Sequence, residues 1–355
     1  MVDRTTTRPA PSGGAALRAH GTFVAPTLEQ VAERAGVSRS TASRAINGGL
    51  RVSPEAMESV AAAVADLGYT PNRAARSLVT RRTDSVALVV PEPDERVLSD
   101  PFFAGVLNGV SSPLAESDLQ LLLIIARPGD SARTVRYLRA GHVDGAIVVS
   151  HHRDDSIDQA LEESGLPCVF IGRPLTPRRT FAFVDTDNVR GAQLATEHLI
   201  GLGRRRIGTI AGPADMSAGL DRLAGWRQAL RAAGLPDDAV VHGDFTVEGG
   251  ETAARRVLAE HPDLDALFIA SDLMAVGALP VIQEAGHEVP GDIAVVGYDN
   301  SGLASTTKPN LTTVVQPVIA MARAAGEELV GQLHGHPARP TPQIFAPELV
   351  VRGSA

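Results

Sequence analysis

A short polar face near the start of the chain carries side chains that could read DNA. Six residues would share the exposed face of one helix: Arg39, Ser40, Thr41, Ser43, Arg44 and Asn47. Short hydroxyl side chains can approach base edges closely, and arginine pairs with phosphate or with guanine. This mixture suits the major groove of DNA, although polar helix surfaces are also common in small helical bundles.

The residues around this face predict the helices that would position it. Thr27 precedes a helical pattern as an N-cap would, Gly36 stands where the first helix must end, and Ser38 can cap the second helix. A third helix would start at Pro54, at its first turn, and end at Gly68. Its predicted apolar stripe is Met57, Val60, Ala61, Val64 and Leu67. The pattern therefore predicts a helix-turn-helix with a supporting third helix.

Charge is divided unevenly along the chain. The whole sequence has a formal net charge of −8, but residues 1–82 hold 11 Arg against 6 Asp and Glu. This head therefore has a charge of +5 and the remainder −13. A basic head on an acidic body predicts contact with nucleic acid at one end of the chain only.

Length and composition are typical of a globular protein with more than one domain. The chain has 355 residues, of which 44% are hydrophobic, and these can form large cores. Its single cysteine, Cys168, excludes an intrachain disulfide, and the apolar neighbours predict a small buried side chain. The apolar run at 119–126 is far shorter than the ~20 residues of a membrane span. Residues 1–25 lack a signal-peptide core and are expected to be disordered, so we expect a cytoplasmic protein.

Residues 84–355 alternate strand-like apolar runs with helical segments. Near-continuous runs of Val, Ile and Leu between helices indicate parallel sheets that are covered on both faces. Eight runs fall into two sets: 85–91, 119–126, 144–150 and 167–172, then 206–212, 239–245, 265–270 and 292–298. The two sets predict an α/β body with two similar lobes of doubly wound parallel sheets and a cleft between them.

Polar and aromatic side chains follow several of these strands, where ligands bind such sheets. The candidates are Phe102, Phe103, Ser150 and Arg173 in the first set, and Phe245, Ser271, Asp272 and Asp299 in the second. Arg222 is expected to begin the helix that ends at Trp226, and Gln316 lies where the chain would cross back to the first lobe. Asp272 and Asp299 could instead cap the helices that follow them. We interpret Trp226 as a packing residue.

Six short stretches, spread along the chain, form a recognisable set: TLEQVAERAGVS, TASRAIN, GYTPNRAARSL, DPFF, RLAGW and DIAVVGYDN. Together they resemble the LacI/GalR family of transcriptional repressors, and the resemblance runs from about Thr27 to Arg352. It implies an all-α helix-turn-helix head and a two-lobed body like that of periplasmic binding proteins. It also implies a homodimer that binds pseudopalindromic operator DNA and responds to a small effector, usually a sugar.

The resemblance also implies roles for residues in the head. Arg39 and Ser40 would read bases, and Arg44 would pair with a base or a phosphate. The residues expected to hold the DNA backbone or to support these contacts are Thr27, Ser38, Thr41, Ser43 and Asn47. Ala42 stands where the family more often has valine, which would slightly loosen its packing in the bundle.

A hinge helix is implied directly after the head. Asn72 would cap it and contact a phosphate, Ala75 would approach the floor of the minor groove, and Leu78 would wedge between base pairs at the operator centre. An apolar wedge unstacks a base step, and the contacts allowed by the bent DNA offset the cost. Without the resemblance, Leu78 would be interpreted as a packing residue in a linker.

In the cleft, the resemblance points to Arg222 and Asp299 as the pair that grips ligand hydroxyls through charge-assisted hydrogen bonds. Phe102 and Phe245 could stack on a sugar ring. The family often has Asn where Ser271 stands, and some members have Asp where Gly172 stands. These departures leave the identity of the effector open. We expect no cofactor, no metal and no catalytic residue.

These implications divide the chain into four parts: a tail at 1–25, a helix-turn-helix domain at 26–71, a hinge helix and linker at 72–83, and an effector-binding and dimerisation domain at 84–355. The N-lobe would hold about 84–184 and 318–345, and the C-lobe about 185–317 and 346–355. The sequence has no C-terminal heptads, so we expect dimers. Rotation of the lobes would separate the short hinge helices, which are stable only when paired on DNA.

Other classes of protein fit the sequence less well. A dehydrogenase would need GxGxxG between a strand and a helix, but the nearest match, at 201–208, lacks the third glycine and precedes a strand. Neither a GxSxG elbow nor a P-loop motif occurs. The HHRDD run at 151–155 is interpreted as a solvated loop in preference to a metal site. A solute-binding receptor is the alternative function, but it would lack the basic head and carry a signal peptide.

Overall fold

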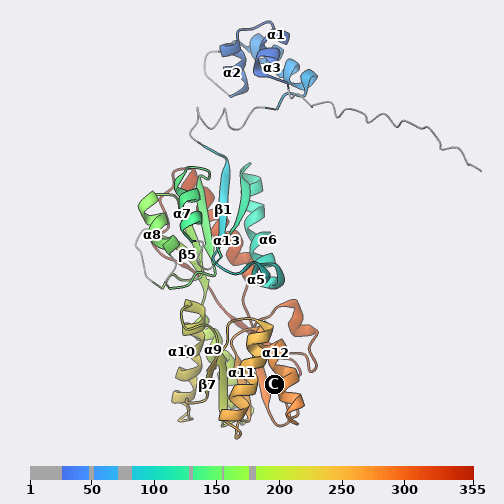
Figure 1. Cartoon of the computed structure of the whole chain (residues 1–355), viewed down its shortest axis with the longest axis vertical. Helices are drawn as coiled ribbons and strands as arrows, with labels where there is room; N and C mark the ends of the chain where they lie inside the picture. Colours follow the sequence, from blue (N-terminus) through green and yellow to red (C-terminus); the bar gives the residue numbers. More distant parts are fainter. Residues whose placement is uncertain (1–25, 48–51, 71–81, 128–130, 154–155, 176–180) are drawn as a thin grey trace, which may run out of the picture. The chain divides into compact units, whose positions relative to one another are not determined.

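The computed structural model describes residues 26–47, 52–70, 82–127, 131–153, 156–175 and 181–355 (Figure 1). The chain divides into two compact units, Met1–Arg81 and Arg82–Ala355. The tail at 1–25 and the predicted hinge residues Asn72, Ala75 and Leu78 lie outside the described residues.

The head contains three described helices, α1 (Leu28–Arg34), α2 (Arg39–Ile46) and α3 (Pro54–Leu67). Their ends carry the predicted caps. Thr27 forms a capping box with Gln30, and Ser38 accepts a hydrogen bond from the backbone of Thr41. The helix α3 starts with Pro54 in its first turn and ends at Gly68, which has left-handed backbone angles. The predicted helix-turn-helix is therefore confirmed.

Packing of the three helices differs in part from the predicted stripe. Val31, Ala42 and Val60 are fully or almost fully buried in the small core of the head. Met57 is 48% exposed and Ala61 is also exposed, whereas Ala63 is buried. The predicted stripe is confirmed at Val60, Val64 and Leu67 and is wrong at Met57 and Ala61. Periodicity alone does not fix which side of α3 meets the two shorter helices.

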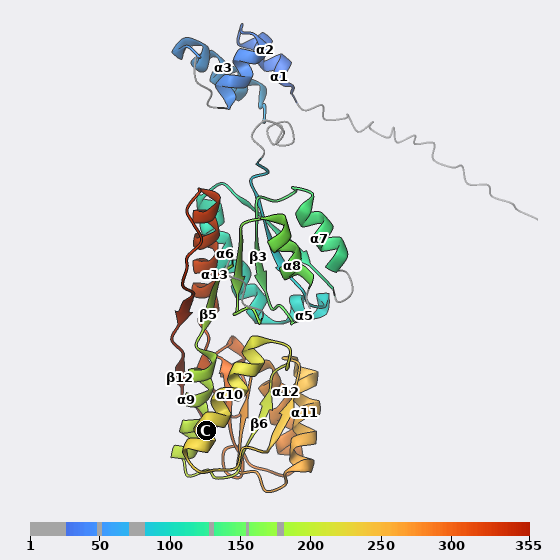
Figure 2. The same cartoon turned by 90° about the vertical axis from the view of Figure 1, so that its left-hand side faces the viewer.

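The N-lobe of the body is a six-stranded parallel sheet with the order β11-β5-β4-β3-β1-β2. Its strands are β1 (Ser85–Val90), β2 (Gln120–Ile125), β3 (Gly145–Val149), β4 (Cys168–Ile171), β5 (Ala182–Thr186) and β11 (Gln343–Phe345). Its helices are α5 (Asp94–Ser99), α6 (Pro101–Glu116), α7 (Ser131–Arg139), α8 (Ser156–Ser164) and α13 (Val318–Leu333). Helices α6 and α13 cover one face of the sheet, and α7 and α8 cover the other (Figure 2).

The C-lobe repeats this plan with the order β12-β10-β9-β8-β6-β7, in which only β12 is antiparallel to its neighbour. Its strands are β6 (Ile207–Ala211), β7 (Val240–His242), β8 (Ala266–Ile269), β9 (Ala294–Asp299), β10 (Thr312–Val315) and β12 (Glu348–Val350). Its helices are α9 (Asn188–Gly201), α10 (Ser217–Ala232), α11 (Val247–Glu260), α12 (Asp272–Glu284) and the 3-10 turn η1 (Gly302–Ser305). Helices α11 and α12 cover one face, and α9 and α10 cover the other.

The predicted fold class is confirmed, and all eight predicted strands are present. Four further strands, β5, β10, β11 and β12, were not predicted because they are short and mix polar with apolar residues. Cys168 is buried on β4, as expected, and burial raises the pKa of its thiol. No helix among the described residues is long and apolar enough to span a membrane.

Three chain segments connect the lobes, and they determine where a site can form. The first joins β5 to α9, the second joins β10 to α13, and the third joins β11 to β12. The first and third segments touch, because the carbonyl of Phe345 accepts hydrogen bonds from the backbone of Asp187 and the hydroxyl of Thr186. Because these segments run from one lobe to the other, their residues can contact both lobes.

Candidate functional site

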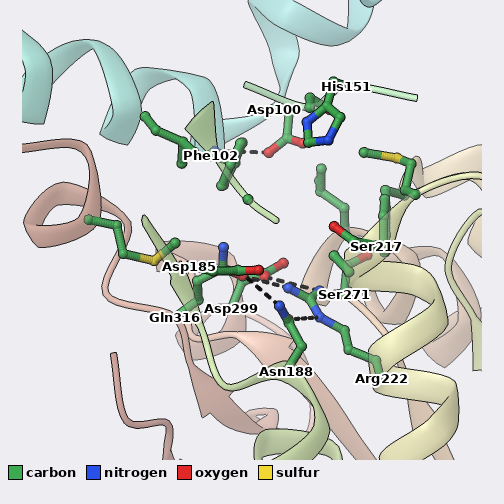
Figure 3. A pocket seen from close by; sticks show the side chains of 18 of the residues that line it. Asp100, Phe102, His151, Asp185, Asn188, Ser217, Arg222, Ser271, Asp299 and Gln316 are labelled. Carbon is green, nitrogen blue, oxygen red and sulfur yellow. Dashed lines mark hydrogen bonds and ion pairs between the residues drawn. The ribbon is translucent and has the colours of Figure 1, made fainter. Parts of the chain in front are cut away.

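A cavity lies between the two lobes of the body. It contains about 710 Å³ of space not filled by protein atoms, part of it open to solvent. Seven predicted ligand residues line it: Phe102, Ser150, Arg222, Phe245, Ser271, Asp299 and Gln316. Phe102 and His151 lie across the space from Arg222 and Asp299 (Figure 3).

Arg222 is the centre of the polar network on the C-lobe side. Its side chain is only 4% exposed, and its guanidinium lies 3.6 Å over the ring of Tyr298. It donates from Nε to Asn188 Oδ1 at 2.9 Å, from Nη1 to the carbonyl of Ala270 at 2.6 Å, and from Nη2 to Gln316 Oε1 at 2.5 Å. A buried guanidinium is tolerated only when its donors are satisfied in this way.

Two of these partners lie at the connections between the lobes. Asn188 is the first residue of α9, directly after the β5 connection, and Gln316 follows β10 on the second connection. Arg222 therefore joins both connecting segments to the C-lobe. A ligand that touches Arg222 would touch the part of the body on which the relative position of the lobes depends.

The cavity also holds carboxylates in unusual surroundings. Asp299 Oδ1 lies 3.5 Å from Arg222 Nη1. Burial raises the pKa of Asp299 well above its usual range, and the charge of Arg222 acts in the opposite direction. Burial likewise raises the pKa of Asp185 to about 6, although its carboxylate accepts hydrogen bonds from the backbone of Arg173 and Thr186. These groups favour a ligand that supplies hydrogen-bond donors and carries no negative charge.

The N-lobe side of the cavity is built differently. Asp100 caps α6 by accepting from the backbone of Phe102 at 2.9 Å, and this directs Phe102 into the cavity. Ser150 donates to Glu92 Oε1 at 2.6 Å, and Arg96 Nη1 donates to the same oxygen at 2.7 Å. This wall therefore combines the partly exposed ring of Phe102 with the hydroxyl of Ser150, which is held by the buried carboxylate of Glu92 behind it.

Three residues of the cavity wall have left-handed backbone angles, which non-glycine residues rarely adopt. They are Ser150 with φ 57°, Phe245 with φ 65° and Asp299 with φ 111°. Such strain persists only where the surrounding structure enforces it, and it concentrates at functional sites. The ring of Phe245 also fills the space beside Gly212, where a Cβ would lie 2.3 Å from Phe245 Cζ.

The lobes also contact each other at the edge of the cavity. His152, after β3, bonds Asp215 Oδ2 of the C-lobe at 2.8 Å through Nδ1 and lies 3.3 Å from Glu92 through Nε2. Arg173 of the N-lobe donates to Asp221 of α10 at 2.7 Å. Hydrogen bonds to the two carboxylates raise the pKa of His152 to about 9.

The candidate DNA-reading face in the head is formed by α2 and its cap. Ser38 Oγ lies 2.9 Å from Ser40 Oγ and 2.8 Å from Thr41 Oγ1, so the hydroxyls form one connected group. Arg39 is 71% exposed and pairs with Glu29 at 2.7 Å. An exposed ion pair of this kind contributes little, so phosphate or a base can replace Glu29.

The same face also carries Arg44, in the last turn of α2, and Asn47, its C-cap. Arg44 Nε donates to the carbonyl of Ser40 at 3.2 Å, and Asn47 Nδ2 donates to the carbonyl of Ser43 at 2.8 Å. Arg44 and Asn47 are exposed, and Ser43 is half-buried. Asn47 Nδ2 also donates to Ser43 Oγ at 3.5 Å, and the guanidinium of Arg44 lies at the exposed surface of the head.

Comparison with protein families gives two matches on this chain. Residues 27–72 match the model of bacterial regulatory proteins of the lacI family, and residues 196–355 match that of the periplasmic binding protein-like domain. The HTH-type transcriptional regulator CelR of Thermobifida fusca is 48% identical over 93% of this chain and 98% of its own length. The MalR regulator of Streptomyces coelicolor is 34% identical over 92% of this chain and 96% of its own. The chain belongs to the lacI family of bacterial regulatory proteins.

Solved structures of lacI-family proteins agree with this assignment. A CelR–cellobiose complex is 46% identical over 93% of this chain and all of its own, with a TM-score of 0.75. A lac repressor dimer bound to operator and the anti-inducer ONPF is 28% identical over 93% of this chain and 99% of its own, with a TM-score of 0.80. Like its relatives, this lacI-family member is a ligand-controlled, DNA-binding transcriptional regulator.

Two predicted ligand residues of this lacI-family chain, together with the candidate Asp272, do not line the cavity. Phe103 is 2% exposed and packs in the N-lobe core, with its ring edge-on to Phe102. Arg173 instead forms the ion pair with Asp221. Both follow a strand as expected, but position in the sequence does not determine the direction of the side chain. Trp226 is fully buried in the C-lobe core, so its interpretation as a packing residue is confirmed.

Two local predictions in this lacI-family body were wrong. Arg222 does not begin its helix, because α10 runs from Ser217 to Ala232 and places Arg222 in its second turn. The HHRDD run is not simply a solvated loop, because His151 is 4% exposed and lines the cavity. Burial lowers the pKa of His151 to about 4, so this imidazole is neutral. Among the described residues, no group of three or more His, Cys, Asp or Glu could hold a metal ion.

Six polar residues of the cavity were not predicted from the sequence: Arg96, Asp100, His151, Asp185, Asn188 and Ser217. Asp100 could have been found, because it is the first residue of the quoted DPFF and caps the helix α6. Asp185 and Asn188 gave no such signal, because they flank the end of β5, which was not predicted. Asp185 and Asn188 reach the cavity because the chain passes from one lobe to the other between β5 and α9.

Proposed function

We propose that this chain forms a homodimeric repressor that binds a pseudopalindromic operator and changes its operator affinity when a sugar occupies the cavity. The observation that carries the proposal is the buried Arg222, which joins Asp299 to both connecting segments through Asn188 and Gln316. A ligand that engages this group acts on the lobes directly. The operator-bound dimer among the similar structures supports the dimeric state.

The proposed ligand is a neutral sugar, with cellobiose as the first candidate. The cavity combines carboxylates, hydroxyls and amides with the rings of Phe102 and Phe245. This combination suits a sugar, whose hydroxyls donate to carboxylates and whose ring faces are apolar. The CelR structure with cellobiose, at 46% identity, supports this candidate.

The proposed ligand contacts are the seven predicted residues that line the cavity, together with Asp185 and Asn188. Phe103 and Arg173 are not among them, because one lies in the core and the other pairs with Asp221. Asp299 and Gln316 would accept or donate to hydroxyls beside Arg222, and Phe102 would cover the sugar from the N-lobe.

The proposed mechanism is a change in the relative position of the lobes. The sugar contacts both lobes, so its binding favours the arrangement in which both sets of contacts are made. The N-lobe starts at β1, directly after the predicted hinge and linker at 72–83, and its movement would alter the spacing of paired hinge helices. We expect a coupling free energy of about 1–3 kcal/mol between sugar and operator.

The DNA contacts proposed for the head follow from the exposed face of α2. Arg39 and Ser40 would read bases, Arg44 would contact a base or a phosphate, and Thr41 and Asn47 would hold the backbone. Thr27, Ser38 and Ser43 are proposed as supporting contacts. The hinge contacts of Asn72, Ala75 and Leu78 stay predictions, because they lie outside the described residues.

The domain boundaries are proposed as 26–71 for the DNA-binding domain, 72–83 for the hinge and linker, and 84–355 for the effector-binding and dimerisation domain. Within the body, the proposed C-lobe takes in 346–355, and β12 pairs with β10 in the C-lobe sheet. We propose that the protein acts in the cytoplasm, where operator DNA is accessible, and that it has no catalytic role.

The test measures operator binding with and without sugar. Fluorescence anisotropy of the full chain on the DNA upstream of its own gene, at fixed low salt, should show nanomolar binding that shifts with cellobiose. Leu78→Ala should weaken operator binding and leave sugar binding unchanged. A full chain without DNA affinity at low salt would overturn the repressor function, and sugar binding without any DNA binding would favour a solute receptor.

A further inference from the structure

The turn that follows β9 has an unusual backbone at two consecutive residues. Asp299 has φ 111° and Asn300 has φ 53°, and neither is glycine. This conformation turns the carboxylate of Asp299 toward Arg222 in the cavity. Non-glycine residues keep such backbone angles only where the surrounding structure enforces them, so some other group must hold the turn.

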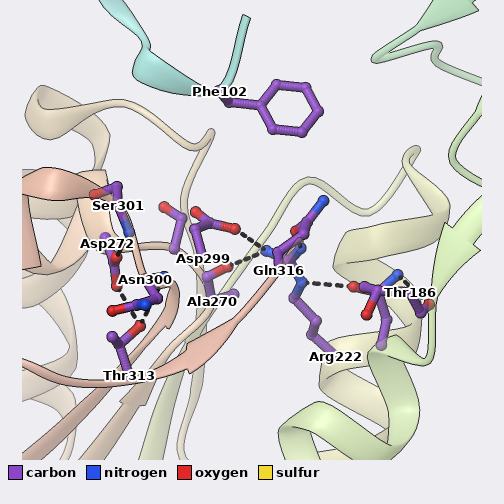
Figure 4. A network of polar contacts seen from close by, with 12 residues as sticks. Phe102, Thr186, Arg222, Ala270, Asp272, Asp299, Asn300, Ser301, Thr313 and Gln316 are labelled. Atoms are coloured by element: carbon purple, nitrogen blue, oxygen red, sulfur yellow. Dashed lines mark hydrogen bonds and ion pairs between the residues drawn. The ribbon is translucent and has the colours of Figure 1, made fainter. Parts of the chain in front are cut away.

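One such group is Asp272, at the start of α12, which is fully buried and does not line the cavity. Its Oδ2 accepts from the backbone N–H of Ser301 at 2.7 Å, and its Oδ1 accepts from Thr313 Oγ1 at 2.6 Å (Figure 4). Thr313 Oγ1 in turn lies 3.3 Å from the backbone N of Asn300, which donates to it. Asp272 does not act as the helix cap, because Ser271 occupies that position.

The strand β9 leaves room for this carboxylate. A Cβ at Gly297 would lie 2.6 Å from Asp272 Oδ1, so any larger residue there would displace Asp272. Gly297, inside the buried strand β9, therefore leaves the space that Asp272 needs to reach the turn that begins two residues later. A helix cap alone would not require this space.

The second group is Arg352, near the last residue of the chain. Its Nη2 donates to Asn300 Oδ1 at 2.7 Å, and its Nη1 donates to the carbonyl of Leu311 at 2.8 Å. The segment around it is fixed by Ser354, which is fully buried and donates to the carbonyl of Val295 at 2.6 Å. Arg352 thus reaches the turn from a segment that is itself attached to β9.

We propose that Arg352 and Asp272 are positioning residues for sugar binding. They hold Asp299 and Asn300 in their left-handed conformation, and this places the Asp299 carboxylate beside Arg222 for a sugar hydroxyl. Neither residue lines the cavity. The proposal rests on the proposed function for its ligand, but the conformation of the turn can be tested without any ligand.

The main test substitutes Arg352, and then adds a second substitution at Asn300 that makes the support from Arg352 unnecessary. Arg352→Met keeps the length of the side chain and loses the donors to Asn300 and Leu311. We expect cellobiose binding by the full chain, measured by calorimetry, to weaken about tenfold, with sugar-free operator binding unchanged. Adding Asn300→Gly should restore sugar affinity to within about threefold of the wild type, because glycine adopts the left-handed conformation without cost.

A matched control distinguishes positioning from general stability. Arg204 also lies in the C-lobe and donates to the backbone carbonyls of Asp292, Pro290 and Gly291, away from the cavity. Arg204→Met should lower the melting temperature and leave sugar affinity unchanged. If Arg352→Met does not fold, Arg352→Lys, which keeps the charge and one donor, should show a smaller loss of sugar affinity.

Two measurements test this proposal, and the second does not depend on which sugar is the effector. Sugar affinity at the wild-type level in Arg352→Met, or equal losses in Arg352→Met and Arg204→Met, would overturn it. Ligand-free crystal structures provide the second readout: the turn at Asp299 and Asn300 should leave the left-handed region in Arg352→Met. A turn unchanged from the wild type would overturn the proposal, whether or not cellobiose is the effector.

Discussion

The two walls of the cavity differ in how completely they are arranged before a ligand arrives. On the C-lobe side, Arg222 bonds Asn188, Ala270 and Gln316, and the Asp299 turn is held by its own network. On the N-lobe side, Phe102 is partly exposed, and its one described ring contact is with Phe103. Both walls contain hydrogen-bonded polar groups, but the C-lobe wall centres on the buried Arg222 network, whereas the N-lobe wall adds the partly exposed ring of Phe102.

This difference suggests that the two lobes have different roles in ligand binding. Fixed donors and acceptors give orientation and specificity, because their arrangement costs nothing when the ligand binds. An aromatic ring on the opposite wall adds affinity only when that wall is close to the sugar. We therefore expect the C-lobe to select the ligand and the N-lobe to respond to it.

The largest expected effect comes from the C-lobe wall. Asp299→Ala should weaken sugar binding about a hundredfold, or 2.7 kcal/mol, because it removes a carboxylate acceptor and leaves the buried Arg222 without its ion-pair partner. Calorimetry of the full chain measures this loss. Sugar-free operator binding should stay within twofold of the wild type. A variant that kept its sugar response would show that the C-lobe wall is not the fixed recognition surface.

A smaller effect is expected from the N-lobe wall. Phe102→Ala should weaken sugar binding about tenfold, because the ring covers the cavity without fixing any hydrogen bond of the ligand. Selectivity among sugars, measured as ratios of dissociation constants, should be unchanged. Leu98→Ala is the control, since Leu98 is 78% exposed on α5 of the same lobe and does not line the cavity. Altered selectivity in Phe102→Ala would contradict the division between the walls.

The smallest effect concerns pH and the contact between the lobes. The raised pKa of His152, about 9, means that its contact with Asp215 and Glu92 is strongest when the imidazole is protonated. Its contribution is complete below the unperturbed pKa near 6.5 and is lost as pH rises through about 9. If the sugar favours lobes in contact, sugar affinity should fall a few-fold between pH 7 and 9.5.

The control for this pH dependence is His152→Gln, which should show a smaller fall over the same range. Other groups around this contact are Arg96, which pairs with Glu92, and the neighbouring His151, which is neutral throughout the range. Asp185, with a pKa of about 6, titrates below it. Equal pH profiles of sugar affinity in the variant and the wild type would show that His152 does not cause the pH dependence.

The head and the strands could be predicted because their signals are local. Thr27, Ser38, Pro54 and Gly68 satisfy or end the backbone hydrogen bonds of their own helices, so residue type and spacing are sufficient. Six of the eight predicted strands are almost entirely buried and mostly apolar, whereas the edge strands β2 and β7 are partly exposed. Residues just beyond those strands were good candidates for the cavity, because parallel strands end at the same edge of a sheet.

The sequence by itself thus determined the helix-turn-helix, the two α/β lobes and most of the cavity residues. Only the tertiary structure decided how Arg222 is bonded, that Phe103 points into the core while Phe102 points into the cavity, and that Arg352 reaches the turn at Asn300. These contacts join residues 34 to 94 positions apart, at chain crossings between lobes and at the end of the chain. No periodicity encodes such pairs, because they depend on where separate elements meet in space.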